Sequence, residues 1–256
     1  SPRDSLCEGH FGHINLPVPI PHFFFVTGNN PLMGDVLNSV CHSCSRINMS
    51  DKTIDYMESQ LDYLFNNSRK NVELTRAISK KGKQLMKEDN DGTVYEFNKA
   101  SRTRLCRYCG AESPEVKFLV NQFVSNFQVI PSTIPGSQWR QDGKAEVYSY
   151  DVAYSIIEDI SDRESRLFGF GERNHPKHMF LTKMPVAPNT LRPTIDVYGG
   201  GKAENDLTIL YSHTVRTSNL LRTMIANNDS DSTRELVSSD LFRLVSQCFT
   251  NNDKKI

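Results

Sequence analysis

Long hydrophobic runs are missing from this 256-residue chain. No apolar stretch approaches the length of about 18 residues that a membrane-spanning helix needs, and no signal peptide precedes the first motif. We therefore expect a soluble intracellular chain with no membrane partner. Because the sequence opens on Ser1 rather than on methionine, we also expect a fragment, a processed chain or part of something longer.

An excess of charge of either sign is also missing, since 30 lysines and arginines balance 30 aspartates and glutamates. A free-standing nucleic-acid-binding domain usually has a basic excess, which the whole chain lacks. The balance is uneven, however, because residues 69–107 hold eleven basic residues and five acidic ones. This stretch is either a surface that lies along phosphates or a solvated helical face.

Cysteine is scarce, with 6 residues in the chain, and four of these six form two short pairs. Cysteine pairs of this kind favour a reducing compartment over a secreted protein held by disulfides. The length allows one large domain or two smaller ones with a sizeable core. We find no internal repeat and no low-complexity segment.

The two cysteine pairs predict a metal site. Cys41 and Cys44 have two residues between them, and Cys106 and Cys109 repeat that spacing. Two such pairs form a tetrahedral Cys₄ set, which suits structural Zn²⁺ and leaves no open position for water. The pairs are 61 residues apart, but the longer loop adds only about 1.2 kcal/mol of closure entropy, against about 10–16 kcal/mol for a structural zinc. The alternative is two unrelated pairs of buried thiols or a disulfide.

Two further groups of residues have metal-ligand character. Cys7 and His10 form a C-x₂-H half-site with no second cysteine pair left to complete it. Either the missing pair lies upstream of Ser1, or the half-site is vestigial. His175 and His178 are separated by Pro176 and do not share one helical face, so we do not expect a metal there.

Hydrophobic periodicity predicts a mixture of helices and short strands. We expect helices over residues 35–40, 51–88 (as two helices), 152–160, 204–227 and 233–249. We expect strands over residues 93–97, 116–129, 146–150 and 195–198, and an extended edge segment over 14–20. Asp151 is the expected N-cap of the helix over residues 152–160, and Ser161 with Glu164 forms a capping-box pattern. Three prolines stiffen an extended arm over 179–193 that presents Arg192.

Four motifs in order resemble a known family. Residues 7–19, CEGHFGHINLPVP, resemble the C-P-G-H-F-G-H-I-x-L-x-x-P signature of the largest subunit of multisubunit DNA-directed RNA polymerases. Residues 106–114 look like the second half of that family's clamp zinc site, whose first half is a C-x₂-C pair such as that of residues 41–44. Residues 184–193, MPVAPNTLRP, are similar to its L-P-V-P-P-x-x-V-R-P arm, and residues 199–208 match the following segment.

The resemblance extends from Cys7 to about Asn227, with departures that suggest a divergent member. Glu8 stands in place of a proline, and the spacing between His10 and Cys41 is longer than expected. The G-H-F-G-H form looks more like the eukaryotic, archaeal or large-virus enzymes than the bacterial one.

The resemblance implies that one zinc ion is held by Cys41, Cys44, Cys106 and Cys109, and that Cys7 and His10 are half of a second site. The family's catalytic Mg²⁺ is held by an N-A-D-F-D-G-D motif, because phosphodiester formation needs closely spaced carboxylates around two metal ions. The nearest pattern here is Asp229-Ser-Asp231, which has no glycine. The chain therefore resembles the clamp portion of a DNA-directed RNA polymerase, a nucleotidyltransferase whose Mg²⁺ belongs only to the complete enzyme.

The implied role is to hold template DNA and the RNA–DNA hybrid through backbone contacts that do not read sequence. The candidate contacts are the basic residues Lys80, Lys81, Lys83, Lys87, Arg102, Arg104 and Arg192. The implied partners are the second-largest polymerase subunit and the remaining polymerase chains. The implied location is the nucleus, or the host cell or virion for a viral enzyme.

We expect an α+β fold, a zinc-stabilised, irregular and helix-rich clamp with short antiparallel strands. In this prediction residues 1–25 are a partial zinc-binding segment, 26–130 a clamp region around the Cys₄ site, and 131–256 a clamp core with the proline-rich arm and long helices. The alternative is a free-standing zinc-stabilised DNA- or protein-binding module. A zinc hydrolase is disfavoured, because a Cys₄ set is closed and no H-E-x-x-H motif is present.

Overall fold

The computed structural model describes the following residues: 9–27, 32–52, 54–55, 58–59, 103–120, 124–131, 146–171, 174–197 and 199–250. Helices alternate with short strands, and the predicted α+β class is confirmed. The chain divides into two compact units, which we describe separately. The first unit comprises Ser1–His22, Val120–Ser125 and Leu181–Ile256, and the second comprises Phe23–Leu119 and Asn126–Phe180. The predicted division into three consecutive parts stays a prediction.

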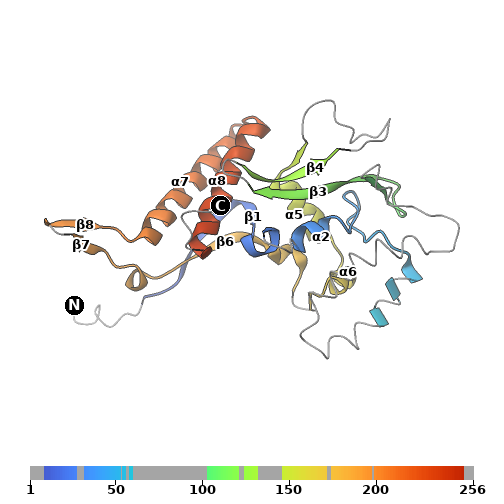
Figure 1. Cartoon of the computed structure of the whole chain (residues 1–256), viewed down its shortest axis with the longest axis horizontal. Helices are drawn as coiled ribbons and strands as arrows, with labels where there is room; N and C mark the ends of the chain where they lie inside the picture. The colour runs from blue at the N-terminus through green and yellow to red at the C-terminus, as the bar shows by residue number, and fades with distance from the viewer. Residues whose placement is uncertain are drawn as a thin grey trace. The chain divides into compact units, whose positions relative to one another are not determined.

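The second unit contains the four-stranded sheet (Figure 1). Its strands, in spatial order, are β2 (Thr103–Leu105), β3 (Glu112–Val120), β4 (Ser125–Ile130) and β5 (Val147–Tyr148). The pairs β2–β3 and β4–β5 are antiparallel. The single strand predicted over 116–129 is wrong, because that stretch contributes to two neighbouring strands, β3 and β4. Its β-branched and aromatic residues favour extended backbone without determining where one strand ends.

Short helices accompany this sheet. They are α1 (Phe23–Val26), α2 (Leu32–Leu37), α5 (Tyr150–Glu158), α6 (Asp162–Leu167) and the 3₁₀ helix η2 (Pro176–Met179). The predicted cap of α5 is wrong by two residues, since the hydroxyl of Ser149, not Asp151, accepts the N–H of Val152 at 3.3 Å. Ser161 caps α6 as predicted, accepting the N–H of Glu164 at 3.3 Å.

The core of the second unit forms where α5 packs against α2, η2 and β5. The fully buried side chains of this core come from residues that lie far apart in the sequence. They include Val36, Leu37, Ile47, Phe127, Ile157 and Leu167. Burying each large aliphatic side chain contributes about 1.5–3 kcal/mol relative to leaving it exposed, so this packing brings residues 36–47 close to α5 and α6.

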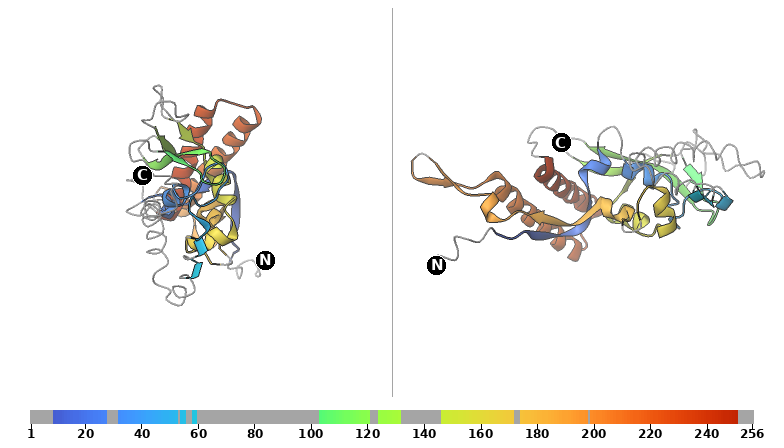
Figure 2. Two further views of the ribbon diagram at one scale, coloured as in Figure 1. Left: turned by 90° about the vertical axis from the view of Figure 1, so that its right-hand side faces the viewer. Right: turned by 90° about the horizontal axis from the view of Figure 1, so that it is seen from below.

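The first unit is built on two long helices that lie side by side, α7 (Asp206–Ala226) and α8 (Asp231–Thr250) (Figure 2). Both contact β1 (Gly12–Pro21), which pairs with β6 (Phe180–Val186). The prolines of β1 are tolerated because both strands of a two-stranded sheet are edges. The predicted edge segment and both predicted long helices are confirmed.

A short hairpin precedes α7 and follows the 3₁₀ helix η3 (Asn189–Leu191). Its strands, β7 (Ile195–Val197) and β8 (Gly201–Ala203), are antiparallel, and the hairpin projects from the N-terminal end of α7 (Figure 2). Gly199 and Gly200 have φ angles of 109° and 85°, which only glycine adopts without strain. Within the described part of the chain, no helix combines the length and apolar character needed to cross a bilayer.

Candidate metal centre

The four paired cysteines converge in the second unit. Their Sγ atoms all lie within 4.8 Å of one another, and Cys41–Cys109 and Cys44–Cys106 are each 3.6 Å apart. Metal–sulfur bonds of about 2.3 Å in a tetrahedron place sulfurs about 3.8 Å apart. The four thiols therefore form one cluster whose donor atoms and spacing fit a single metal ion, and two unrelated buried pairs are excluded.

Each C-x₂-C turn, which we call a knuckle, is shaped by backbone hydrogen bonds. In the first knuckle the N–H of Ser45 donates to the carbonyl of Cys41, and the N–H of Cys41 donates to the carbonyl of Arg46, both at 2.9 Å. The N–H of Ser43 lies 3.4 Å from the Sγ of Cys41. Ser45 has a φ of 55°, in the left-handed region.

The second knuckle repeats this pattern at the same offsets. Gly110 donates to the carbonyl of Cys106 and Cys106 to the carbonyl of Ala111, again at 2.9 Å. The N–H of Tyr108 lies 3.4 Å from the Sγ of Cys106, and Gly110 has a φ of 72°. The two knuckles are thus two copies of one local structure, which explains why the identical spacing produced two matched pairs of clustered cysteines.

Burial and neighbouring groups shift the pKa values of three of the thiols. Burial alone would raise the pKa of Cys41, but hydrogen bonds from the backbone of Cys44 and Ser43, and from the Ser113 hydroxyl, lower that pKa to about 7. Burial and the neighbouring thiols raise the pKa of Cys44 to about 12, and burial also raises that of Cys106. A cation bound among the sulfurs would lower the pKa of all four thiols, because a coordinating thiol is deprotonated outright.

His42, inside the first knuckle, is not a ligand. Its Nε2 lies 3.0 Å from the carbonyl of Leu37 and its Nδ1 lies 3.1 Å from the hydroxyl of Tyr148. The neutral ring with its proton on Nε2 satisfies both contacts, because Nδ1 can then accept from the tyrosine. Both ring nitrogens are therefore engaged in fixing the knuckle to neighbouring segments.

Tyr108 joins the second knuckle to the segment that follows the first one. Its hydroxyl donates to the carbonyl of Met49 at 2.6 Å and contacts Asp51 at 3.1 Å. The guanidinium of Arg46 lies 3.7 Å from the centre of the Tyr108 ring and 3.6 Å from Asp51. Burial and the carboxylate of Asp51 raise the pKa of Tyr108 to about 12.

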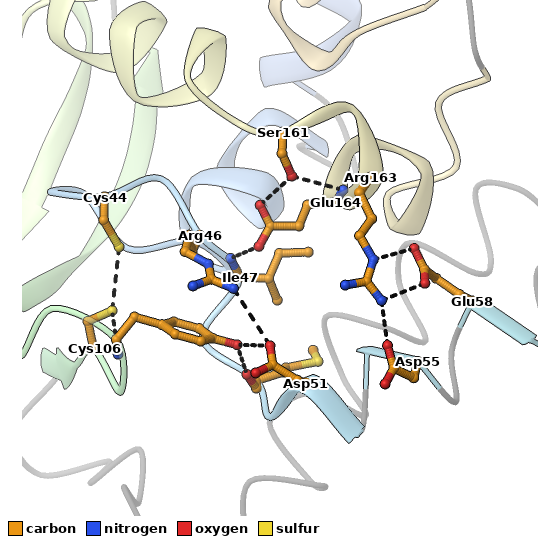
Figure 3. A network of polar contacts seen from close by, with 12 residues as sticks. Cys44, Arg46, Ile47, Asp51, Asp55, Glu58, Cys106, Ser161, Arg163 and Glu164 are labelled. Carbon is orange, nitrogen blue, oxygen red and sulfur yellow. Dashed lines mark hydrogen bonds and ion pairs between the residues drawn. The ribbon is translucent and has the colours of Figure 1, made fainter.

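Glu164 of helix α6 holds the segment that follows the first knuckle (Figure 3). Glu164 accepts the backbone N–H of Ile47 at 3.0 Å and the hydroxyl of Ser161 at 2.8 Å. Beside it, Arg163 donates to both carboxylate oxygens of Glu58, at 2.8 and 2.7 Å, and also pairs with Asp55. The hydrogen bonds from Arg163 lower the pKa of Glu58.

Several predicted site residues lie elsewhere or outside the described residues. The residues that lie outside are Cys7, Lys80, Lys81, Lys83, Lys87 and Arg102. His10 is exposed, and Arg104 lies on β2 opposite Ser113. His175 caps η2 by accepting the N–H of Lys177 at 3.1 Å.

Arg192 lies in the first unit and is half-buried. Its Nε donates to the carbonyl of Ala187 at 3.0 Å, and its Nη1 donates to Thr208 at 3.1 Å. The guanidinium also lies 5.4 Å from the ring centre of Tyr211. Much of its hydrogen-bonding capacity is thus used within the unit.

A groove of about 550 Å³ that sequence patterns did not predict adjoins Arg192. It is lined by Gly12, His13, Ile14, Val186, Arg192, Thr208, Tyr211, Ser212, Val215 and Arg216. Strand β1 and helix α7 contribute most of this lining. No local signal could have revealed it, because these two elements are nearly two hundred residues apart in the sequence.

The described residues form a mixed α+β structure in which two distant knuckles build a four-thiol cluster that could hold a metal ion. Residues 3–255 match the family described as RNA polymerase Rpb1, domain 1, and the chain belongs to that family. The resemblance inferred from the four sequence motifs is therefore confirmed.

Relatives in archaea and in a eukaryote agree with this assignment. The DNA-directed RNA polymerase subunit Rpo1N of Thermococcus celer is 28% identical over 250 residues, 95% of this chain and 23% of that protein. Its counterpart in Methanocaldococcus jannaschii is 27% identical over 242 residues, 93% of this chain and 15% of that protein. The DNA-directed RNA polymerase II subunit RPB1-B of Trypanosoma brucei brucei is 28% identical over 223 residues, 84% of this chain and 12% of that protein. The chain spans less than a quarter of each of these relatives.

Proposed function

We propose that this chain is the clamp portion of the largest subunit of a DNA-dependent RNA polymerase, where it holds template DNA and the RNA–DNA hybrid during transcription. The observation that carries the proposal is the family match over residues 3–255, in a chain whose distant knuckles form one cysteine cluster. A rigid body assembled from separated segments suits a passive holding role.

Zn²⁺ is the ion that we propose for the cluster, held by Cys41, Cys44, Cys106 and Cys109. Soft thiolates in a closed set of four favour zinc and leave no position for a reacting water. The ion would join the two knuckles and neutralise their thiolates without taking part in a reaction. Cys7 and His10 remain a proposed half of a second site.

Nucleotidyl transfer would belong to the complete enzyme, together with its Mg²⁺ and catalytic aspartates. The proposed partners are the second-largest subunit and the remaining polymerase chains. The proposed location is the nucleus, or the host cell or virion for a viral enzyme.

Nucleic-acid contacts are proposed for the basic residues already named. Arg192 would reach a phosphate through Nη2, since its Nε and Nη1 donate within the first unit. Such contacts give affinity that depends on salt and not on sequence.

Affinity purification through a tag on this chain tests the proposal. We expect the second-largest subunit and other polymerase chains to co-purify in fixed ratio, and photo-crosslinking of the assembled enzyme to place template DNA against this chain. A stable monomer that never carries polymerase chains would contradict it. Tight, steeply salt-dependent binding of duplex DNA by the isolated chain would instead favour a free-standing module.

A further inference from the structure

The similarity of the two knuckles extends beyond the cysteines. Asn48 lies seven residues after Cys41, and Ser113 lies seven residues after Cys106. Val40 bridges to Ile47 just as Leu105 pairs with Glu112, so both segments return along the strand that enters the knuckle. Each segment therefore carries a buried polar side chain at the equivalent position, 7% exposed for Asn48 and 2% exposed for Ser113.

Asn48 binds the backbone on both sides of Cys106. Its Nδ2 donates to the carbonyl of Leu105 at 2.9 Å, and its Oδ1 accepts the N–H of Arg107 at 3.1 Å. These are the two peptide groups that flank Cys106. Fixing both of them fixes the direction in which the Cys106 side chain leaves the backbone.

Ser113 makes the reciprocal contacts with Cys41. Its Oγ accepts the N–H of His42, the residue after Cys41, at 3.0 Å. The same hydroxyl lies 3.7 Å from the Sγ of Cys41 and can donate to it. A side chain from each knuckle segment thus holds the first cysteine of the other knuckle, and the acceptor bonds occupy equivalent backbone positions.

We infer that Asn48 and Ser113 are a reciprocal pair of positioning residues, which orient Cys106 and Cys41 across the cluster and so determine how tightly a metal ion is retained. This inference rests on the proposed metal site. The cysteines of the two knuckles are separated by more than sixty residues, so the knuckles need contacts besides the ion to keep their relative orientation. Groups that orient metal ligands typically change metal affinity by roughly 10–100-fold when removed.

Asn38 provides a matched control, because it makes the same kind of paired contact away from the cysteines. Its Nδ2 donates to the carbonyl of Val116 at 2.7 Å and its Oδ1 accepts the N–H of Val116 at 2.9 Å. Its removal should cost stability in the same way, but the peptide groups that it binds do not flank a ligand.

The experiment uses the whole 256-residue chain, loaded with zinc, as wild type and as Asn48→Ala, Ser113→Ala and Asn38→Ala. Metal content is measured first, then the rate of zinc transfer to a chromophoric chelator and the free energy of unfolding. We expect Asn48→Ala and Ser113→Ala to retain zinc roughly 10–100-fold less tightly. Asn38→Ala should lower stability while releasing zinc at the wild-type rate.

Cobalt substitution separates the two positioning residues. Ser113→Ala removes a hydrogen bond to the Cys41 sulfur, so its sulfur-to-cobalt charge-transfer band should move to longer wavelength, whereas that of Asn48→Ala should not. If the wild type holds one ion and all three variants release it at one rate, the positioning role is wrong while the metal site stands. A wild-type chain that binds no ion overturns both.

Discussion

The Oε1 of Glu164 lies 3.0 Å from the backbone N–H of Ile47, although 117 residues separate the two in the sequence. Glu164 is 5% exposed, and its second carboxylate oxygen accepts the hydroxyl of Ser161 at 2.8 Å. One side chain therefore contacts the N-cap residue of α6 and also holds the segment that leaves the first knuckle. The start of a short helix is in this way linked to the segment that carries the first two cysteines of the cluster.

Glu164→Ala should lower the free energy of unfolding by about 1–3 kcal/mol, because the buried N–H of Ile47 loses its acceptor. Denaturant titration followed by circular dichroism measures this. Glu158→Ala is the control, since Glu158 contacts Tyr154 and Lys177 at the surface and should cost less than about 0.5 kcal/mol. Equal effects of the two substitutions would show that Glu164 has no special role.

Gly110→Ala should destabilise the chain by about 1–2 kcal/mol, because a Cβ in the left-handed region is strained. The cause is backbone conformation alone, since a Cβ at Gly110 would meet no atom within 4 Å. Ser45 occupies the equivalent position with a φ of 55°. Ser45→Gly should change stability by less than about 0.5 kcal/mol, because relief of strain opposes the greater freedom of glycine in the unfolded chain. A neutral Gly110→Ala would contradict this account.

Arg163→Gln should lower stability slightly at neutral pH, and the difference from wild type should disappear in acid. Hydrogen bonds from Arg163 lower the pKa of Glu58 in the folded chain. A lowered carboxyl pKa contributes stability above the unfolded pKa of about 4.3, and this stability is lost as pH falls through the folded pKa. Unfolding free energies of both proteins between pH 7 and pH 3 measure it. A difference that grows on acidification would refute the assignment.

Lys80, Lys83 and Lys87, changed together to glutamine in the assembled enzyme, should weaken binding to template DNA. For every phosphate that no longer meets a lysine, the slope of log affinity against log salt should fall in magnitude by about 0.9. The control makes the same charge change at three exposed lysines, Lys52, Lys117 and Lys183. Fluorescence anisotropy across a salt series distinguishes the two. Identical slopes for both triple variants would exclude Lys80, Lys83 and Lys87 from the DNA contact.

The amino-acid sequence by itself determined the features whose causes are local. Two C-x₂-C spacings identified the four cysteines that cluster, Ser161 was identified as the cap of α6, and apolar periodicity located α7 and α8. The sequence did not decide between two capping residues that lie close together. Ser149 caps α5 where Asp151 was expected, because both are good capping residues close to the helix start.

Only the tertiary structure decided which side chains hold the cysteines in place. Asn48 meets Leu105 across 57 residues, and Glu164 meets Ile47 across 117. A polar side chain that satisfies a distant backbone group leaves no periodic pattern in the sequence, because its partner is fixed by how the core packs. The cysteines of the cluster could therefore be identified from their spacing, whereas the side chains that contact their knuckles depended on the folded chain.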